Sequence, residues 1–186
     1  MPRRTTKIVR GHCYHVYSRG HDRSRLFETD RHYAHYATLL RRYLHDAGDS
    51  VHAYCLMPNH FHLMLRPWSD DCPGRLGRMQ MAFSKAVQRE TGRTGSAYEG
   101  RYQAIEVDTE AYGLGLSRYI HRNAYDAGLC RSVADWKWSS YPDYVGPRFG
   151  TLPDTRWLAA ESTPGRYRRF VEADNAPSLP AGLLFD

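Results

Sequence analysis

The spacing of apolar and polar residues predicts most of the secondary structure of this chain of 186 residues. Residues that alternate between the two classes, or stay apolar for several positions, are typical of a strand, whereas apolar residues at every third or fourth position form one face of a helix. The segments with the strand pattern are 13–18, 51–57, 60–66 and 102–107. The segments with the helix pattern are 31–47, 74–91 and 110–127. The first six elements follow the order β-α-β-β-α-β, so we expect an α+β fold with a ferredoxin-like core and an antiparallel sheet.

The last of these helices, 110–127, lies outside the ferredoxin-like order. Asp108 or Thr109 can cap its first turn, because both side chains offer an oxygen to the free backbone N–H groups there. Gly128 can end it, since glycine tolerates the backbone conformation that follows many helices. We therefore expect an added helix that packs against the predicted core.

The chain changes in character near residue 140, because six of its ten prolines lie beyond that point. We expect 142–153 to be a surface loop and a short helix near 165–173 to dock on the core. The domains we expect are a flexible basic arm (1–10), a main domain (11–145) and a C-terminal extension of loop, short helix and tail (146–186). Support of the domain, simple coverage of the core and recognition of DNA are all compatible roles for that extension.

The strand predicted at 60–66 carries two histidines on one face. Side chains two residues apart in a strand point the same way, so His60 and His62 lie together while three apolar side chains form the opposite face. Two imidazoles a few ångströms apart can chelate a divalent cation. An exposed strand face that carries two histidines for no functional reason explains the spacing equally well, so both interpretations stay open.

The formal net charge is +6 at pH 7, and the whole excess lies in the first 25 residues. That segment holds seven arginines and lysines against one aspartate, whereas the rest of the chain is balanced. A concentrated basic segment suits a polyanion, most simply a nucleic acid. Arginine greatly outnumbers lysine, as expected where forked side chains bind phosphate, but a GC-rich genome produces the same bias.

The cysteines point to a reducing compartment. The chain has four cysteines without Cys-x-x-Cys spacing, and it shows neither a signal peptide nor an apolar run long enough to cross a bilayer. We therefore expect a cytoplasmic protein with free thiols and no membrane partner.

Five blocks of sequence point to a known family. They are GHCYHVYSRG (11–20), HAYCLMPNHFHLML (52–65), GRYQA (100–104), SRYIHRN (117–123) and DWKWSSY (135–141). In this order they resemble the HUH-type single-tyrosine transposases, and within them most closely the REP-associated tyrosine transposases (RAYTs). The resemblance runs from about residue 11 to 145. It implies a ferredoxin-like core whose central strand holds the paired histidines, followed by a helix that delivers a nucleophilic tyrosine.

The resemblance also assigns roles by position. His60 and His62 match the metal ligands of the family, and Tyr119 matches its nucleophile. Asn123 matches the polar residue one turn later that completes the metal site, which would hold Mg²⁺ or Mn²⁺. Where many relatives have proline after this asparagine, the present chain has Ala124, so we expect its helix to continue further.

The activity that this resemblance implies is DNA transposition. Such an enzyme cleaves single-stranded DNA beside hairpins, such as REP elements, and rejoins it through a 5′-phosphotyrosine. By geometry alone, Tyr112 or Tyr125 on the same helix could also supply the nucleophile. The alternative function is a catalytically silent, sequence-specific nucleic-acid-binding protein on the same fold. We expect a monomer rather than a homodimer, although the sequence leaves open whether one chain or two build the site.

Basic residues near the N-terminus, on the expected outer face of helix 74–91 and in the block at 100–104 are candidates for DNA contact. They are Arg3, Arg4, Lys7, Arg10, Arg19, Arg75, Arg78, Lys85 and Arg101. A solvated helix face explains those on 74–91 equally well. For His12, His15 and His121 we expect packing or DNA contact rather than metal binding.

Overall fold

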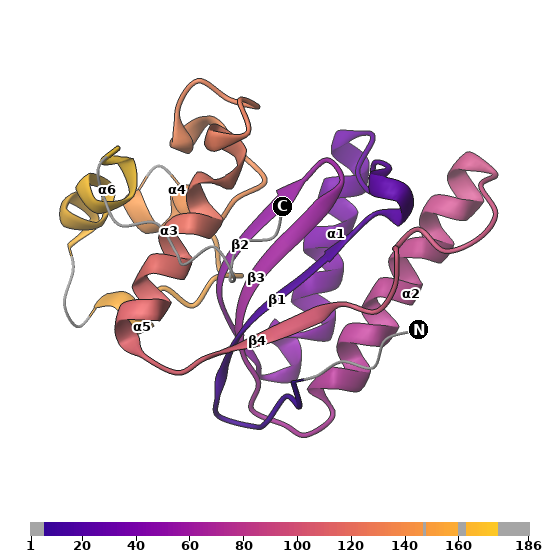
Figure 1. The fold of residues 1–186 in the computed structure, drawn as a ribbon, viewed down its shortest axis with the longest axis horizontal. Coiled ribbons are helices and arrows are strands. Elements are labelled where there is room, and N and C mark those ends of the chain that lie inside the picture. Colours follow the sequence, from indigo (N-terminus) through magenta and orange to yellow (C-terminus); the bar gives the residue numbers. More distant parts are fainter. Residues whose placement is uncertain (1–5, 147, 160–162, 175–186) are drawn as a thin grey trace.

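The computed structural model describes residues 6–146, 148–159 and 163–174, and an antiparallel sheet lies at its centre (Figure 1). Within these residues, four strands form the sheet in the order β2-β3-β1-β4. Their bounds are β1 Cys13–Arg19, β2 Ser50–Met57, β3 His60–Arg66 and β4 Gln103–Val107. Each neighbouring pair is antiparallel, with β3 and β1 in the middle. The predicted ferredoxin-like α+β core is confirmed.

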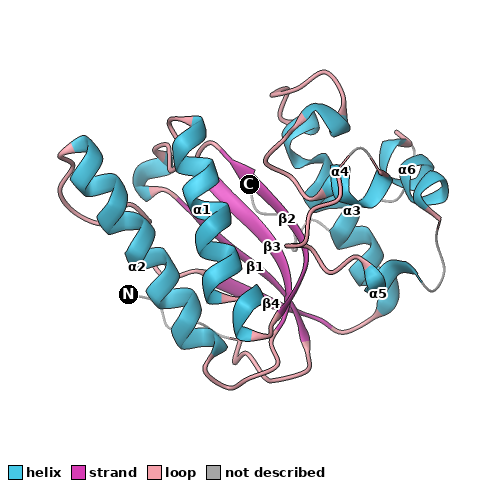
Figure 2. Cartoon of the chain, turned by 180° about the vertical axis from the view of Figure 1, so that it is seen from behind, coloured by secondary structure: helices cyan, strands magenta, loops and turns pink. Residues whose placement is uncertain are grey.

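Helices cover both faces of this sheet. Figure 2 shows α1 (Asp30–Tyr43) and α2 (Cys72–Thr91) side by side over one face. The opposite face carries α3 (Glu110–Asp126), beyond which lie α4 (Tyr141–Val145), α5 (Arg156–Ala159) and α6 (Pro164–Glu172) (Figure 1). Short 3₁₀ turns occur at η1 (His21–Arg23), η2 (His45–Ala47) and η3 (Val133–Asp135). The sheet is thus a middle layer between two layers of helices.

The two faces of β3 differ as the sequence predicts. Phe61, Leu63 and Leu65 are fully buried in the larger apolar core, which α1 and α2 complete. Met64 faces the other way, into the smaller core beneath α3, and His62 shares that face. The histidines therefore lie between the sheet and the added helix.

Some element boundaries differ from the prediction. The helix expected over 31–47 ends at Tyr43, and η2 leads to Gly48 in a left-handed conformation (φ 89°). The segment 142–153 was expected to be a loop, but its first residues belong to α4. Pro142 is compatible with a helix there because it lies in the first turn, where its missing N–H costs no hydrogen bond. Helix α3 continues past Asn123 to Asp126, as expected for a chain with Ala124 in place of proline.

The described part of the segment expected to be a flexible arm (1–10), residues 6–10, contacts the core. Ile8 is 7% exposed and belongs to the larger core. The backbone N–H of Val9 donates to the Tyr14 hydroxyl over 2.8 Å. A single buried apolar side chain is enough to dock a short segment, although the segment has no periodic apolar pattern. Arg3 and Arg4 lie outside the described residues, as does the tail expected beyond 174.

The C-terminal extension is packed onto α3 rather than separate from the main domain. Tyr167 and Val171 of α6 are buried in a third apolar cluster with residues of α4. Two arginines of α3 donate to backbone carbonyls near the end of α6: Arg118 to Phe170 (3.1 Å) and Arg122 to Val171 (3.1 Å). These contacts support a role of the extension in holding α3 in place.

Two further predictions concern the cysteines and membranes. All four cysteines are free thiols, as expected. Among the described residues, no helix combines the length and apolar character needed to cross a membrane.

Candidate active site

The site begins with the register of the two central strands. Arg19 of β1 lies directly opposite His60 of β3, and Tyr17 lies opposite His62. Residues paired in this way have their Cβ atoms only about 4.5–5.5 Å apart. The sheet therefore gathers a cation, a phenol and two imidazoles on the face that α3 covers.

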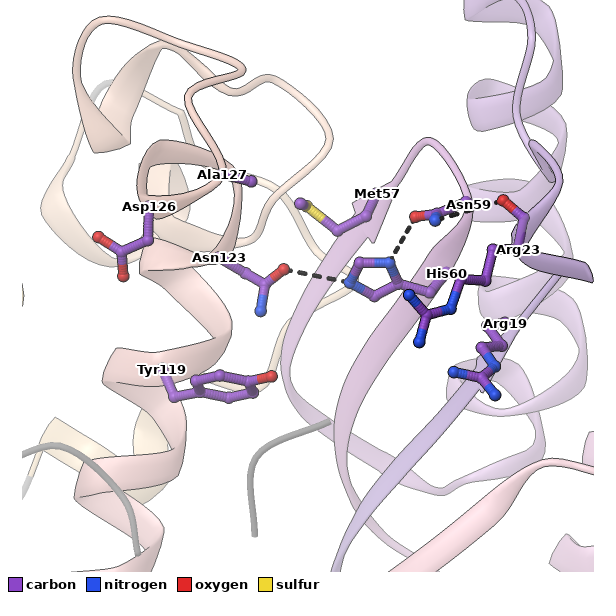
Figure 3. Close-up of a pocket in the computed structure, with 9 residues that line it drawn as sticks. All are labelled: Arg19, Arg23, Met57, Asn59, His60, Tyr119, Asn123, Asp126 and Ala127. Carbon is purple, nitrogen blue, oxygen red and sulfur yellow. Dashed lines mark hydrogen bonds between the residues drawn. The ribbon is translucent and has the colours of Figure 1, made fainter. Parts of the chain in front are cut away.

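Helix α3 approaches this face closely because small and flexible residues line the contact. A Cβ at Gly113 would lie 3.3 Å from the Cε atom of Met64, closer than ordinary van der Waals contact, so the methionine side chain would have to shift to admit a larger residue. Ile120 and Ala124 are fully buried on the same side of the helix. Tyr119 directly precedes Ile120, and Asn123 directly precedes Ala124. Both therefore lie at the edge of the buried face of α3. They are one turn apart and lie near the His60 end of β3 (Figure 3).

A cavity of about 370 Å³ lies between this end of the sheet and α3 (Figure 3). The residues that line it are Arg19, Arg23, Met57, Asn59, His60, Tyr119, Asn123, Asp126 and Ala127. The structure thus brings together, within a single chain, three of the residues predicted for catalysis or metal binding. The fourth, His62, does not line the cavity; it is completely buried, with its ring centroid 4.9 Å from that of His60.

His60 is held between two amide side chains. Its Nδ1 atom lies 2.7 Å from Oδ1 of Asn59, the preceding residue. Its Nε2 atom lies 3.2 Å from Oδ1 of Asn123 on α3 (Figure 3). Asn59, in the turn that precedes β3, therefore orients the ring through Nδ1, while Nε2 faces α3.

His62 is held by a third histidine. The Nε2 atom of His15 lies 2.9 Å from Nδ1 of His62, and the two rings are stacked with centroids 5.1 Å apart. His15 is fully buried, so the expectation that it has a packing role is consistent with its position. The contact with His62 was missed, because only the β1–β3 register brings residues 47 positions apart together.

Tyr119 stands over the histidines. Its ring is edge-on to that of His62, with centroids 5.2 Å apart. The other candidate nucleophiles lie elsewhere: Tyr112 packs against the sheet beneath α3, and Tyr125 stacks on the guanidinium of Arg122 at 5.1 Å. Neither lines the cavity that contains His60, which favours Tyr119 as the reactive group.

Burial keeps both candidate ligand histidines neutral. It lowers the pKa of His60 below the usual value, although the Asn123 oxygen beside Nε2 acts in the opposite direction. Burial lowers the pKa of His62 much further, and the neighbouring rings of His15 and His60 add to this. A neutral imidazole has a lone pair on one nitrogen, which is the form that binds a cation.

The donor atoms present fit a divalent cation. With the Nδ1 proton of His60 directed at Asn59, the Nε2 atom and the Asn123 oxygen face each other with lone pairs, a contact that a shared cation satisfies. Among the described residues, no group of three or more His, Cys, Asp or Glu side chains is arranged to hold a metal. An ion here would therefore be held by two histidines and an amide oxygen, a mixed set that suits Mn²⁺ or Mg²⁺.

Two arginines give the cavity a positive wall. Arg19 lines it while also donating to Glu99, with Nη2 and Oε1 3.0 Å apart. Arg23 was not among the predicted site residues. Its backbone and that of Asp22 are left-handed (φ 57° and 49°), a conformation that is costly for residues other than glycine and often occurs at functional sites. The η1 turn thereby directs Arg23 toward His60 (Figure 3).

Arg75, one of the predicted DNA-contacting residues, is held by contacts within the protein. Arg75 was expected on the outer face of α2, but its side chain is only 13% exposed. It binds the buried carboxylate of Asp49 over 2.5 Å and donates to the Tyr43 carbonyl over 3.0 Å. The orientation was wrong because Arg75 lies in the first turn of α2, beside the loop that connects α1 to β2.

Other basic residues line a second hollow, of about 810 Å³, between α2 and the segment before β4. Arg78, Lys85 and Arg101 all contribute to it. Arg78 pairs with Asp71 over 2.7 Å, whereas Lys85 and Arg101 form no ion pair within the described part of the chain. Lys7 and Arg10 are exposed near the N-terminus. Contact of these basic residues with DNA stays a prediction.

The remaining histidines of the predicted set are not near the cavity. His12 is exposed and lies 2.5 Å from a carboxylate oxygen of Glu106. His121 is fully buried and bonds to Tyr167 (2.7 Å) and Ser140 (2.8 Å), which makes it a structural link between α3 and the C-terminal part.

Comparison with known proteins identifies the group to which these features belong. The family model described as "Transposase IS200 like" matches residues 8–123, which contain all four predicted catalytic and metal-binding residues. No curated protein matches the chain. A solved structure of a REP-associated tyrosine transposase bound to a REP hairpin is similar, with 19% identity and a TM-score of 0.64 over 78% of this chain and 86% of the other. A Deinococcus radiodurans protein assigned only provisionally as a transposase matches 70% of this chain and 100% of its own, with 19% identity and a TM-score of 0.39.

Proposed function

The chain belongs to the IS200-like transposase family, and from this premise we propose that it cleaves and rejoins single-stranded DNA beside hairpins, using Tyr119 as nucleophile. The observation that carries the proposal is the meeting of Tyr119, His60 and Asn123 at one cavity, with His62 directly beneath. A tyrosine without a site to activate a phosphate, or a pair of histidines without a nucleophile, would not support it.

In the proposed reaction, the Tyr119 oxygen attacks a phosphorus atom of the DNA backbone. A bond forms between that oxygen and the phosphorus as the hydroxyl loses its proton, and the bond to the 3′-oxygen breaks. The leaving strand takes up one proton as a free 3′-OH, which balances the proton lost by the tyrosine. The other strand remains on the protein as a 5′-phosphotyrosine, which conserves the energy of the broken bond. Attack by the 3′-OH of a second DNA end reverses these steps and rejoins the strands without ATP.

The residues around Tyr119 would orient and neutralise the phosphate. His60, His62 and Asn123 would hold Mg²⁺ or Mn²⁺, which when bound would polarise a phosphate oxygen and stabilise negative charge in the transition state. Arg19 and Arg23 line the same cavity and would bind the non-bridging oxygens. The cavity thereby combines a nucleophile, neutral ligands and positive charge.

The hollow beside α2 is the proposed path for the rest of the DNA. His21 and Glu99 line this hollow, and their neighbours Arg19 and Arg23 line the cavity that contains His60. The hollow and the cavity therefore adjoin each other. Lys85 would contact phosphates there, and Arg101 would do the same. A structurally similar REP-associated transposase was solved with a REP hairpin, which supports a DNA hairpin as the partner of this chain.

A trapping assay tests the proposal. The protein is incubated with Mn²⁺ and a pool of hairpin oligonucleotides with randomised single-stranded flanks, labelled at the 3′ end, because that end would stay attached to Tyr119. We expect a labelled protein band on a denaturing gel, absent with Tyr119→Phe. Binding of hairpins without any covalent species would instead favour the catalytically silent DNA-binding protein.

A further inference from the structure

Each candidate ligand histidine has a polar side chain behind it, at the nitrogen that faces away from the proposed cation. For His60 this partner is Asn59, 2.7 Å from Nδ1. For His62 it is His15, with its Nε2 atom 2.9 Å from Nδ1. A neutral imidazole carries one proton, so a partner at Nδ1 determines whether the lone pair is on Nε2.

The orientation of the Asn59 amide settles the proton on His60. The Nδ2 group of Asn59 faces the carbonyl of Arg23 at 3.5 Å, and only a donor is favourable there. Its Oδ1 atom is therefore the one next to His60, and an oxygen acceptor requires the proton to be on Nδ1. The lone pair of His60 is then on Nε2, the atom 3.2 Å from Asn123.

The pair formed by His15 and His62 shares one proton between two nitrogens. When His62 supplies that proton from Nδ1, its own lone pair is on Nε2; when His15 supplies it, the Nε2 atom of His62 is protonated and cannot bind a cation. His15 is fully buried against His62, and a neutral ring there has one nitrogen with a lone pair that can accept this proton. Among the described residues the Nδ1 atom of His15 has no hydrogen-bond partner, so no donor there requires its lone pair to be on Nδ1 instead of Nε2.

We propose that His15 and Asn59 are positioning residues, which hold His62 and His60 in the Nδ1-protonated tautomer so that both present Nε2 to a divalent cation. The inference rests on the proposed metal site but not on the chemistry of Tyr119. Both partners act through hydrogen bonds rather than by contact with the ion. Removing such a partner of a metal-bound histidine typically lowers metal affinity by about 10- to 100-fold.

Paired substitutions separate hydrogen bonding from packing. His15→Leu fills similar space without an acceptor, whereas His15→Gln places an amide oxygen near the original Nε2 atom. Asn59→Leu and Asn59→Asp form the second pair, in which only the aspartate keeps the oxygen. All four are made in the Tyr119→Phe background, so no cleavage intervenes, and thermal melting checks that each protein folds.

Mn²⁺ affinity is measured by electron paramagnetic resonance, which reports free Mn²⁺ directly. We expect His15→Leu and Asn59→Leu to bind about 10- to 100-fold more weakly, and the Gln and Asp variants to recover most of that loss. Unchanged affinity in both leucine variants, or equal losses within each pair, would overturn the inference. If His60→Ala binds Mn²⁺ as tightly as the parent protein, the proposed metal site itself fails.

Nitrogen-15 NMR of the imidazoles tests the tautomers in the unsubstituted protein, and so does not depend on any variant folding. For His60 we expect a protonated Nδ1 and an unprotonated Nε2 without added metal. For His62 we expect the same assignment with saturating Mg²⁺. Protonation of Nε2 in either ring under these conditions contradicts the inference.

Discussion

The Nε2 atom of His60 lies 3.2 Å from the Oδ1 atom of Asn123, although the two residues are 63 positions apart in the sequence. One belongs to the central strand β3 and the other to α3, a helix outside the ferredoxin-like core. A single chain therefore brings these two groups together, without a residue from a second copy.

The first prediction concerns the nucleophile. Tyr119→Phe keeps the ring but removes the oxygen, so we expect hairpin binding to persist while the covalent product disappears. Denaturing gels with 3′-labelled DNA measure the product. Tyr112→Phe and Tyr125→Phe are matched controls on the same helix and should form it normally. Product in the Tyr119→Phe protein would transfer the role to one of these.

The second prediction concerns the metal ligands. His60→Ala and His62→Ala should each abolish cleavage at any practical Mg²⁺ concentration, because a missing imidazole removes an essential donor. Asn123→Ala should cleave more weakly and respond to excess Mn²⁺, since water can replace one neutral oxygen ligand. Cleavage rates across a metal titration distinguish these cases, and normal rates in both histidine variants would exclude the site.

The third prediction concerns the hollow beside α2. Lys85→Gln and Arg101→Gln should weaken DNA binding, and each lost phosphate contact should reduce the slope of log K against log salt by about 0.7 for single-stranded DNA. Arg89→Gln is the matched control, because Arg89 is exposed on the same helix but does not line the hollow. Binding isotherms at several salt concentrations provide the slopes. Equal slopes in all proteins would place the DNA elsewhere.

The fourth prediction concerns stability at low pH. Burial lowers the pKa of His121 to about 3, whereas in the unfolded chain it is about 6.5. Below pH 6.5 the unfolded state therefore binds a proton that the folded state does not, so the free energy of unfolding falls as pH decreases toward 3. In His121→Gln the dependence should weaken by up to about 1.4 kcal/mol per pH unit. Urea denaturation at pH 7, 6 and 5 measures it, and an unchanged dependence would contradict this assignment.

The fifth prediction concerns the segment before β1. Ile8→Ala should lower the free energy of unfolding by about 2–5 kcal/mol, because a buried side chain is removed from the larger core. Lys7→Ala, an exposed neighbour, should change it little. Denaturant unfolding compares the two variants. Equal stabilities would mean that residues 6–10 contribute nothing to the core.

Much of the fold follows from the sequence alone, because the period of apolar residues depends only on local backbone geometry. The alternation in 60–66 predicted which side chains of β3 enter the core. The apolar residues that recur every third or fourth position in 74–91 form the buried face of α2, as Leu76, Met79 and Phe83 show. The candidate residues at the cavity were likewise named from the pattern of five sequence blocks. Their assigned chemical roles stay predictions.

Other features depended on contacts between distant parts of the chain. The partner of His62 is set by the register of β1 and β3, and that register is a property of the whole sheet. Ile8 entered the core because the folded domain offers an apolar surface, which no local period reveals. Arg75 and Arg78 carry the same charge three residues apart, yet one binds the buried carboxylate of Asp49 and the other pairs with the exposed carboxylate of Asp71. Local spacing determines which face of its helix or strand a side chain occupies. Which residues it contacts on that face is decided by how the other elements pack.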